Sequence, residues 1–264
     1  MKNCLTISIL LFLISCSEYQ NTNNNKYPNY KPEEWDKLIK DRLPSLKNDG
    51  IHFSYDLYNS DNIDTSKIFD FVEGLHIMKT HLDSIPKDIL VFRNLKELSI
   101  LHSQIDTLYN WIGEFNNLQK FSIYDSKVKH IPKGIGNLSN LIELQLFRST
   151  IQSIPPEIGN LASLKDLDIS TNPLSTFHPE WGNLKNLESL RMGALRLKQL
   201  PGFVVSLTSL KYLRISSLGL TSLPDEISNL KHLKKMNCVY NNFSLKERER
   251  IEKLLPNTKI EFEY

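Results

Sequence analysis

One repeating pattern of apolar residues organises the chain. A 23-residue unit recurs from Val72 to about Phe243, with no residue inserted or lost between units. Each unit begins apolar-x-x-apolar-x-apolar, and further apolar residues follow at its eleventh, fourteenth, eighteenth and twenty-first places. The units start at Val72, Leu95, Leu118, Leu141, Leu164, Leu187, Leu210 and Leu233. Because so short a unit cannot bury its own apolar side, neighbouring units must stack, and the pattern predicts a solenoid.

The first third of each unit predicts one short strand. In the unit that starts at Leu141, the apolar residues Leu144 and Leu146 alternate with polar neighbours. This period is typical of a strand with one buried face. Later in the unit, Ile154 precedes Pro155, and the proline keeps that residue extended and removes a backbone donor. We therefore expect the chain to turn there, cross back and align its strands as a parallel sheet.

The period and the leucine spacing together resemble the leucine-rich repeat, as in LIELQLFRSTIQSIPPEIGNLAS from Leu141 to Ser163. The resemblance implies an α/β solenoid, a horseshoe with a parallel sheet on its concave face and a cap at each end. The asparagine that usually occupies the ninth place is present only at Asn172 and Asn241. Because leucine cannot make the hydrogen bonds of that asparagine side chain, we expect a partial asparagine ladder and a different local turn at Leu195 and Leu218.

The N-terminus has the pattern of an export signal. One lysine precedes an apolar run from Leu5 to Ile14, which is far shorter than the roughly 20 residues that a membrane-spanning helix needs. The run ends in Leu-Ile-Ser-Cys at Cys16, which resembles a bacterial lipobox. The resemblance implies that residues 1–15 are a lipoprotein signal peptide and that Cys16 carries the lipid. An ordinary cleaved leader or a weak internal anchor is the alternative.

Composition divides the remaining chain into a tether, two caps and the solenoid. Residues 16–31 are rich in asparagine and poor in apolar residues, which predicts a flexible tether. Residues 32–71 are expected to form an N-terminal cap over the first unit, and 72–243 the solenoid of eight units, the last one partial. Residues 244–264 are expected to form a C-terminal cap, with an amphipathic helix and then a strand.

The sequence offers no residues for catalysis. It has no glycine-rich phosphate loop, no nucleophile elbow and no pair of histidines at ligand spacing. Of its three cysteines, Cys4 lies in the leader, Cys16 is the proposed lipid site and Cys238 falls at a core place. We therefore expect no enzyme activity, no metal and no cofactor. The net charge of +2, without basic blocks, also gives no indication of nucleic-acid binding.

Four large apolar residues at the seventh place of consecutive units form what we call the apolar strip. They are Met78, Leu101, Tyr124 and Phe147. On an outward strand position, a contiguous strip of this kind, rimmed by charged residues such as Arg148, predicts a partner site. Two alternatives to a partner site stay open, since strands favour such residues in general and the N-terminal cap could fold over them.

Two arginines occupy the fifth place of neighbouring units further along. Parallel strands are about 4.8 Å apart, so Arg191 and Arg214 should stack as like charges unless an anion or carboxylate satisfies them. Asp168 can reach only the nearer arginine. The arrangement favours one salt bridge beside one solvated arginine, and the alternative is an acidic-ligand site at the pair.

The sequence as a whole predicts a lipid-anchored, extracytoplasmic binding module of a bacterial cell envelope, at the outer membrane or cell surface. Eight strands would give a flat face about 34 Å long, which suits a protein or an extended polymer better than a small molecule. A monomer is expected. The alternatives are a scaffolding envelope lipoprotein, or an intracellular regulator if the leader does not function. The predicted ligand-binding residues are Met78, Leu101, Tyr124, Phe147, Arg148, Arg191 and Arg214.

Overall fold

A computed structural model describes residues 37, 40–41, 51–55, 69–70, 72–79, 81–195 and 197–263. The chain divides into two compact units, Met1–Pro44 and Ser45–Tyr264. In the first unit only Lys37, Lys40 and Asp41 are described, and they are helical. The predicted signal peptide, the tether and Cys16 lie outside the described residues.

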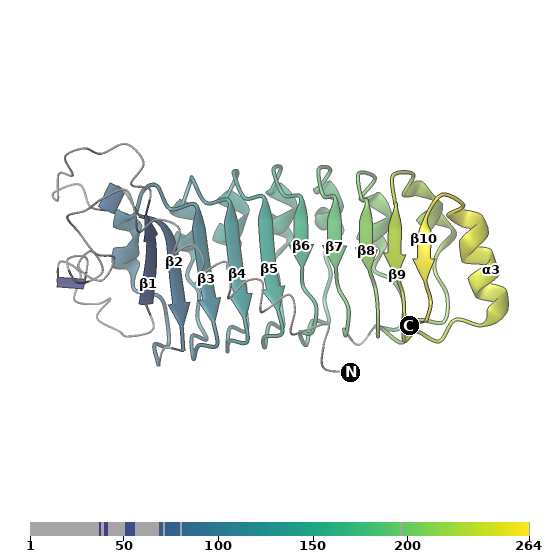
Figure 1. Cartoon of the computed structure of the whole chain (residues 1–264), viewed down its shortest axis with the longest axis horizontal. Helices are drawn as coiled ribbons and strands as arrows, with labels where there is room; N and C mark the ends of the chain where they lie inside the picture. Colours follow the sequence, from purple (N-terminus) through teal and green to yellow (C-terminus); the bar gives the residue numbers. More distant parts are fainter. Residues whose placement is uncertain are drawn as a thin grey trace, which may run out of the picture. The chain divides into compact units, whose positions relative to one another are not determined.

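The second unit is built around one sheet whose strands follow each other in sequence order (Figure 1). Among the described residues it has ten strands, and the first, β1 (Ile51–Tyr55), pairs antiparallel with the second. The other strands, all parallel, are β2 (Val72–Met78), β3 (Glu97–Leu101), β4 (Lys120–Tyr124), β5 (Glu143–Phe147), β6 (Asp166–Asp168), β7 (Ser189–Arg191), β8 (Tyr212–Arg214), β9 (Lys235–Asn237) and β10 (Lys259–Glu261). The predicted solenoid with one parallel strand per unit is confirmed.

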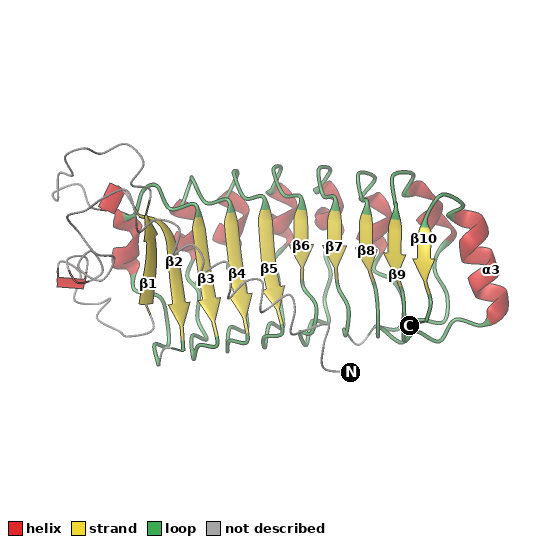
Figure 2. Ribbon diagram, viewed as in Figure 1, coloured by secondary structure: helices red, strands yellow, loops and turns green. Residues whose placement is uncertain are grey.

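Each return segment between β2 and β9 contains a short 3-10 helix, and these helices lie behind the sheet in Figure 2. They are η3 (Lys87–Val91), η4 (Asn110–Glu114), η5 (Lys133–Asn137), η6 (Pro156–Asn160), η7 (Pro179–Asn183), η8 (Gly202–Ser206) and η9 (Asp225–Asn229). The proline before such a helix keeps an extended conformation, as Pro155 does with φ −74° and ψ 160°. Since proline also lacks the N–H that a further ladder hydrogen bond would need, the chain leaves the strand direction there and crosses back.

The core lies between the sheet and the 3-10 helices. Leu144 and Leu146, at the fourth and sixth places of one unit, are fully buried, and so is Ile158 on the helix side. The constant period aligns these places across strands, so that Phe121 pairs with Leu144 and Leu144 with Leu167. Each such side chain contributes about 2 kcal/mol by leaving water, and stacking joins the contributions into one continuous core.

A partial asparagine ladder links the turns that follow the strands, as predicted. The Oδ1 atom of Asn172 accepts from the N–H groups of Ser149 and Ile151 in the preceding unit, at 3.2 and 3.3 Å. Its Nδ2 atom donates to the carbonyl oxygen of Leu146 at 2.7 Å. Asn241 makes the corresponding bonds, while the Ser149 hydroxyl accepts from the Ser126 N–H at 3.2 Å. A hydroxyl therefore replaces part of the asparagine's role.

The turns at Leu195 and Leu218 differ less than expected from the sequence. Both leucines turn into the core and are almost fully buried. The residue before each keeps the left-handed conformation found at the eighth place of every unit, with φ 55° at Ala194 and 57° at Ser217. The local difference lies at Gly219, the residue after Leu218. It has φ +80°, a conformation that glycine adopts without a steric penalty.

A second row of asparagines was not foreseen. It occupies the last place of the unit, directly before the next unit's first leucine, and each Nδ2 atom donates to a carbonyl oxygen 24 residues earlier at 2.7 to 3.0 Å. The members are Asn94, Asn117, Asn140 and Asn186. The two rows link the turns at both ends of the strands to the preceding unit.

A close backbone approach accounts for the glycine of the Ile-Gly-Asn-Leu segments better than turn geometry does. A Cβ atom on Gly159 would lie 2.2 Å from the carbonyl oxygen of Glu180 in the next unit, and a side chain cannot fit there. The φ angle of Gly159 is not positive. Glycine at this place therefore allows the 3-10 helices of successive units to pack closely.

The C-terminal end of the sheet is covered by a helix, α3 (Leu245–Leu254), which precedes β10. The Ser244 hydroxyl caps it by accepting from the Glu247 N–H at 3.3 Å. Glu247 also accepts from the Leu223 N–H at 3.0 Å, and Ile251 is fully buried. This arrangement matches the expected helix and strand of the C-terminal cap. None of the described helices is long and apolar enough to cross a membrane.

We predict that Asn172→Ala lowers the free energy of unfolding by about 3 kcal/mol, because it leaves two N–H groups and a carbonyl without their partner in the interior. Urea denaturation followed by circular dichroism measures this. Ser126→Ala is the control, since its buried Oγ has no hydrogen-bond partner among the described residues, and it should change stability by less than about 0.5 kcal/mol. Equal losses in the two variants would contradict the role given to the ladder.

Candidate functional site

The outward residues of the strands form the candidate site. Strand register brings the seventh places into one row, in which Met78 pairs with Leu101, Leu101 with Tyr124, and Tyr124 with Phe147. The structure therefore places the four residues of the apolar strip side by side on consecutive strands. The row continues with smaller residues in the later units.

Tyr124 is the centre of what we call the aromatic cluster, which consists of His102, Tyr124, Asp125, Phe147 and Arg148. Its ring packs edge-on against His102 and in a tilted arrangement against Phe147, with both centroids 4.9 Å away. The Arg148 guanidinium donates to the Tyr124 hydroxyl at 3.1 Å. On the other side, the Nδ1 atom of His102 lies 2.8 Å from Asp125 Oδ2. Aromatic contacts and charged rim thus form one connected group.

The apolar strip is less open than expected from the sequence. Leu101 is 5% exposed and Tyr124 9% exposed, whereas Met78 and Phe147 are half-buried. Large side chains in rows about 4.8 Å apart cover much of one another's surface. Contact with a partner would therefore use Phe147 and the exposed Arg148 more than the middle of the strip.

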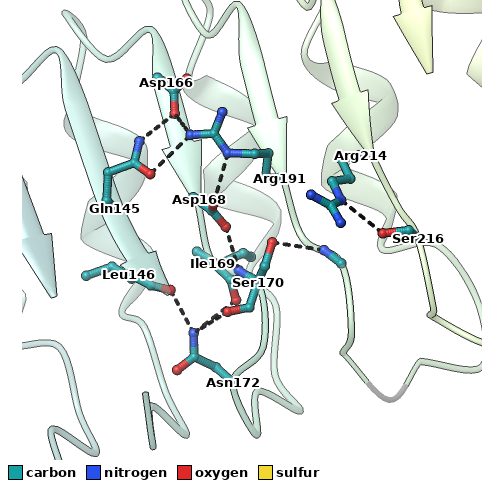
Figure 3. Close-up of polar contacts among 11 residues, drawn as sticks. Gln145, Leu146, Asp166, Asp168, Ile169, Ser170, Asn172, Arg191, Arg214 and Ser216 are labelled. Atoms are coloured by element: carbon teal, nitrogen blue, oxygen red, sulfur yellow. Dashed lines mark hydrogen bonds and ion pairs between the residues drawn. The ribbon is translucent and has the colours of Figure 1, made fainter. Parts of the chain in front are cut away.

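Arg191 is the centre of a second group, the arginine network, drawn in Figure 3. Its Nε atom donates to Asp168 at 2.8 Å, and its Nη2 atom donates to Asp166 at 2.7 Å and to Gln145 at 3.1 Å. The Gln145 amide donates to the same Asp166 oxygen at 2.8 Å, and Asp168 accepts from the Ser170 N–H at 2.9 Å. Two carboxylates and an amide therefore engage this guanidinium from within the protein.

Arg214 has a different environment, although strand register places it directly beside Arg191. It is exposed, and its Nε atom donates to the neutral Ser216 hydroxyl at 3.0 Å. No carboxylate forms an ion pair with it among the residues that the structure describes. The arrangement that the sequence favoured is therefore the one found: Arg191 is held in salt bridges, with Asp166 as well as Asp168, and Arg214 is open to solvent.

Charge balance in the arginine network follows from its burial. Burial raises the pKa of Asp166 above its ordinary value, although Arg191 and the Gln145 amide act in the opposite direction. Burial alone would lower the pKa of Arg191, but Asp168 and Asp166 raise it above its ordinary value. The guanidinium therefore stays charged, and its charge opposes the effect of burial on Asp166.

Sequence reasoning found only Asp168 as a partner of Arg191. Asp166 lies at the third place of the strand that also holds Asp168, and Gln145 at the fifth place of the strand before. The strand register alone would have indicated that both residues can reach Arg191, because a guanidinium spans neighbouring rows. The choice between them depends on side-chain rotamers, which a repeat pattern does not specify.

The described residues contain no group of three histidine, cysteine or acidic side chains that could hold a metal ion. Burial raises the pKa of the Cys238 thiol to about 12, so the thiolate that a nucleophile requires does not form near neutral pH.

Comparison with known proteins agrees with the geometry. A family model described as a leucine-rich repeat region matches residues 156–256. The solved structure of a leucine-rich repeat protein from Leptospira interrogans is similar, with a TM-score of 0.68 and 32% sequence identity over 75% of this chain and 50% of that one. The chain thus spans about half the length of that protein. No curated protein matches it. The chain has the leucine-rich repeat fold, and repeat domains of this class generally bind other proteins.

We predict that Arg191→Gln lowers the free energy of unfolding by about 2 kcal/mol at pH 7, because it leaves Asp168, only 11% exposed, and Asp166 without their cation. Burial already raises the pKa of Asp166 above its ordinary value, and without Arg191 that pKa should rise further. The loss of stability is then complete at a pH above the raised pKa and is relieved as the pH falls through it. Urea denaturation of both proteins at pH 7 and pH 4 should show the difference shrinking in acid. A difference that grows in acid would contradict this electrostatic account.

Proposed function

We propose that this protein is a lipid-anchored, extracytoplasmic binding module that recognises a protein ligand on the outward face of its sheet and performs no catalysis itself. The aromatic cluster is the observation that carries the proposal. It joins the Tyr124 ring, the half-buried Phe147 ring tilted against it and an exposed Arg148 at one point of the face. Aromatic residues and arginine are the types enriched at the energetic centres of protein interfaces.

The shape of the face favours a macromolecule. Strands β2 to β9 are separated by seven gaps of about 4.8 Å, which gives a row about 34 Å long. Outward strand residues make a broad surface that cannot enclose a small molecule. An extended polymer would also fit, but a row that combines apolar and paired charged groups suits the mixed surface of a protein.

The charges at the edge of the face support the same choice. Lys120 pairs with Glu143 at 3.4 Å on neighbouring strands, and Glu188 with Lys211 at 2.7 Å. Such pairs cancel charge along the row, so the described part of the face has no continuous basic stripe for a phosphate backbone. A protein partner therefore agrees better with the charge pattern than a nucleic acid does.

We predict that Phe147→Asp abolishes recovery of the partner in a pull-down from cell-envelope and neighbouring-cell extracts. A carboxylate at this point would have to be desolvated against the partner's apolar surface, which should weaken binding at least tenfold. Tyr109→Asp is the matched control, since Tyr109 is 49% exposed and precedes η4 on the opposite side of the solenoid. The control variant should recover the same partner as the native chain.

Equal recovery by both variants would move the binding site away from the aromatic cluster. If neither the native chain nor a variant retains a specific protein, the scaffolding alternative becomes the better interpretation. Circular dichroism must show the same folded content in all three proteins. The comparison then reports on recognition and not on stability.

The lipid anchor is proposed from the sequence of the leader. We predict that cells given an alkyne fatty acid label the native chain, and that Cys16→Ser removes both the label and membrane attachment. Several acyl chains give stable anchoring where one does not. Cys4→Ser is the matched control, because Cys4 lies inside the proposed signal peptide and should leave labelling unchanged. An unlabelled native chain would favour the intracellular alternative.

A further inference from the structure

Arg214 is a cation on the candidate binding face that no described acidic side chain neutralises. A guanidinium has five N–H donors, and here one of them meets the Ser216 hydroxyl at 3.0 Å. Its neighbour on one side, Arg191, is already held by two carboxylates. On the other side Asn237, paired with Arg214 in the sheet, donates its amide to Glu261 at 3.0 Å.

The nearby carboxylates are also engaged. Asp166 and Asp168 bind Arg191, and Glu261 binds Lys235 at 2.9 Å as well as Asn237. Hydrogen bonds from Lys235 and Asn237 lower the pKa of Glu261 below its ordinary value, so it stays ionised and bound to them. An acid that binds Arg214 would therefore come from outside the described residues.

The surroundings of Arg214 leave room for such a group. Gly193 lies beside it on the preceding unit, and a Cβ atom there would be 3.7 Å from the Arg214 Nε. Because glycine has no side chain, nothing from Gly193 covers the guanidinium. Tyr212 lies two residues before Arg214, on the same side of β8, and is 49% exposed. It offers a ring on which an incoming chain can pack.

We propose that Arg214 binds a carboxylate side chain of the protein ligand, at the end of an extended segment whose apolar residue contacts Phe147. The inference rests on the proposed function and specifies its ligand. A single guanidinium without an acidic partner matches the single charge and planar shape of a carboxylate, which it can bind through two parallel hydrogen bonds. A phosphate group carries up to two negative charges, which a second free cation would balance, but the nearby Lys211 and Lys235 are both paired with acids.

The geometry fixes the spacing of the two contacts. Phe147 lies on β5 and Arg214 on β8, three strand gaps away, or about 14 Å across the sheet. Phe147 is at the seventh place and Arg214 at the fifth, an offset of about 7 Å along the strands. An extended chain advances about 3.3 to 3.6 Å per residue. The acid should therefore lie four or five residues from the apolar residue in the ligand.

Selection from a phage-displayed library of random linear peptides on the immobilised full chain tests this. The native chain should enrich peptides with an aromatic or large aliphatic residue and an Asp or Glu four or five residues away. Arg214→Gln should lose the preference for the acid and keep that for the apolar residue. Arg93→Gln is the matched control, because Arg93 is exposed in the turn before β3, away from the face, and should select as the native chain does.

A synthetic peptide with the enriched sequence, and its acid-to-amide counterpart, give the quantitative test. Calorimetry should show that Arg214→Gln weakens binding of the acidic peptide by about tenfold and leaves binding of the amide peptide unchanged. A purely structural role for Arg214 would weaken both peptides equally. Circular dichroism of each variant verifies its fold.

The outcomes separate this inference from the proposed function. If the native chain and Arg214→Gln both enrich peptides with an apolar residue but no acid, the carboxylate contact is wrong. The proposed protein-binding face would still stand. Acid enrichment that persists in Arg214→Gln also overturns it. Selection of phosphate-mimicking pairs of acids would point to a phosphorylated ligand and overturns the single-carboxylate assignment. No enrichment by the native chain overturns both proposals.

Discussion

A single unit of this protein cannot satisfy its apolar side chains and its backbone hydrogen bonds without its neighbours. One side of its apolar layer is open, and the N–H and C=O groups along its strand point sideways to the next unit, as in the pairing of Leu144 with Phe121 and Leu167. Stacking at a constant period satisfies both needs at once. The asparagines at Asn172 and Asn140 then link the turns at the two ends of the strands. The sheet, the core and the candidate binding face all depend on this fixed register.

The same register decides which outward groups can serve a ligand. Residues in a row about 4.8 Å apart form ion pairs wherever opposite charges are neighbours. Arg191 is an example, because Asp168 and Asp166 both accept hydrogen bonds from its guanidinium. Groups committed to internal bonds are poorly available to a partner, because each bond must be broken before a new one forms. Under the proposed function, recognition would use groups that are not held in this way, Arg214 and the accessible side of Phe147. The face would then offer an apolar contact and a charged contact at separate points.

Much of the fold could be predicted from the sequence, because an unbroken period fixes strand order, direction and register together. The alternation at Leu144 and Leu146 was sufficient to place β5 and its buried face. The site was predicted less well, since side chains such as Gln145 and Asp166 select partners by rotamer and distance. The exposure of Tyr124 also depends on how its neighbours pack, and residue type alone does not determine it. Predictions that rest on residues outside the described ranges, above all Cys16, stay predictions.

The left-handed residues at the eighth place carry a further consequence. Their φ angles lie between 49° and 58°, yet the residues are Lys79, His102, Asp125, Arg148, Thr171, Ala194, Ser217 and Tyr240. Hydrogen bonds between units, such as that from the Thr171 N–H to the Gly193 carbonyl, impose this conformation whatever the side chain. Each residue accepts a cost of about 1 to 2 kcal/mol, and apart from half-buried His102 their side chains are exposed at the border of the binding face. Apart from His102, Asp125 and Arg148, which make side-chain contacts in the aromatic cluster, substitutions in this row should alter the exposed charge and shape with little change in stability. Under the proposed function, the ligand preference could therefore change without a change in the fold.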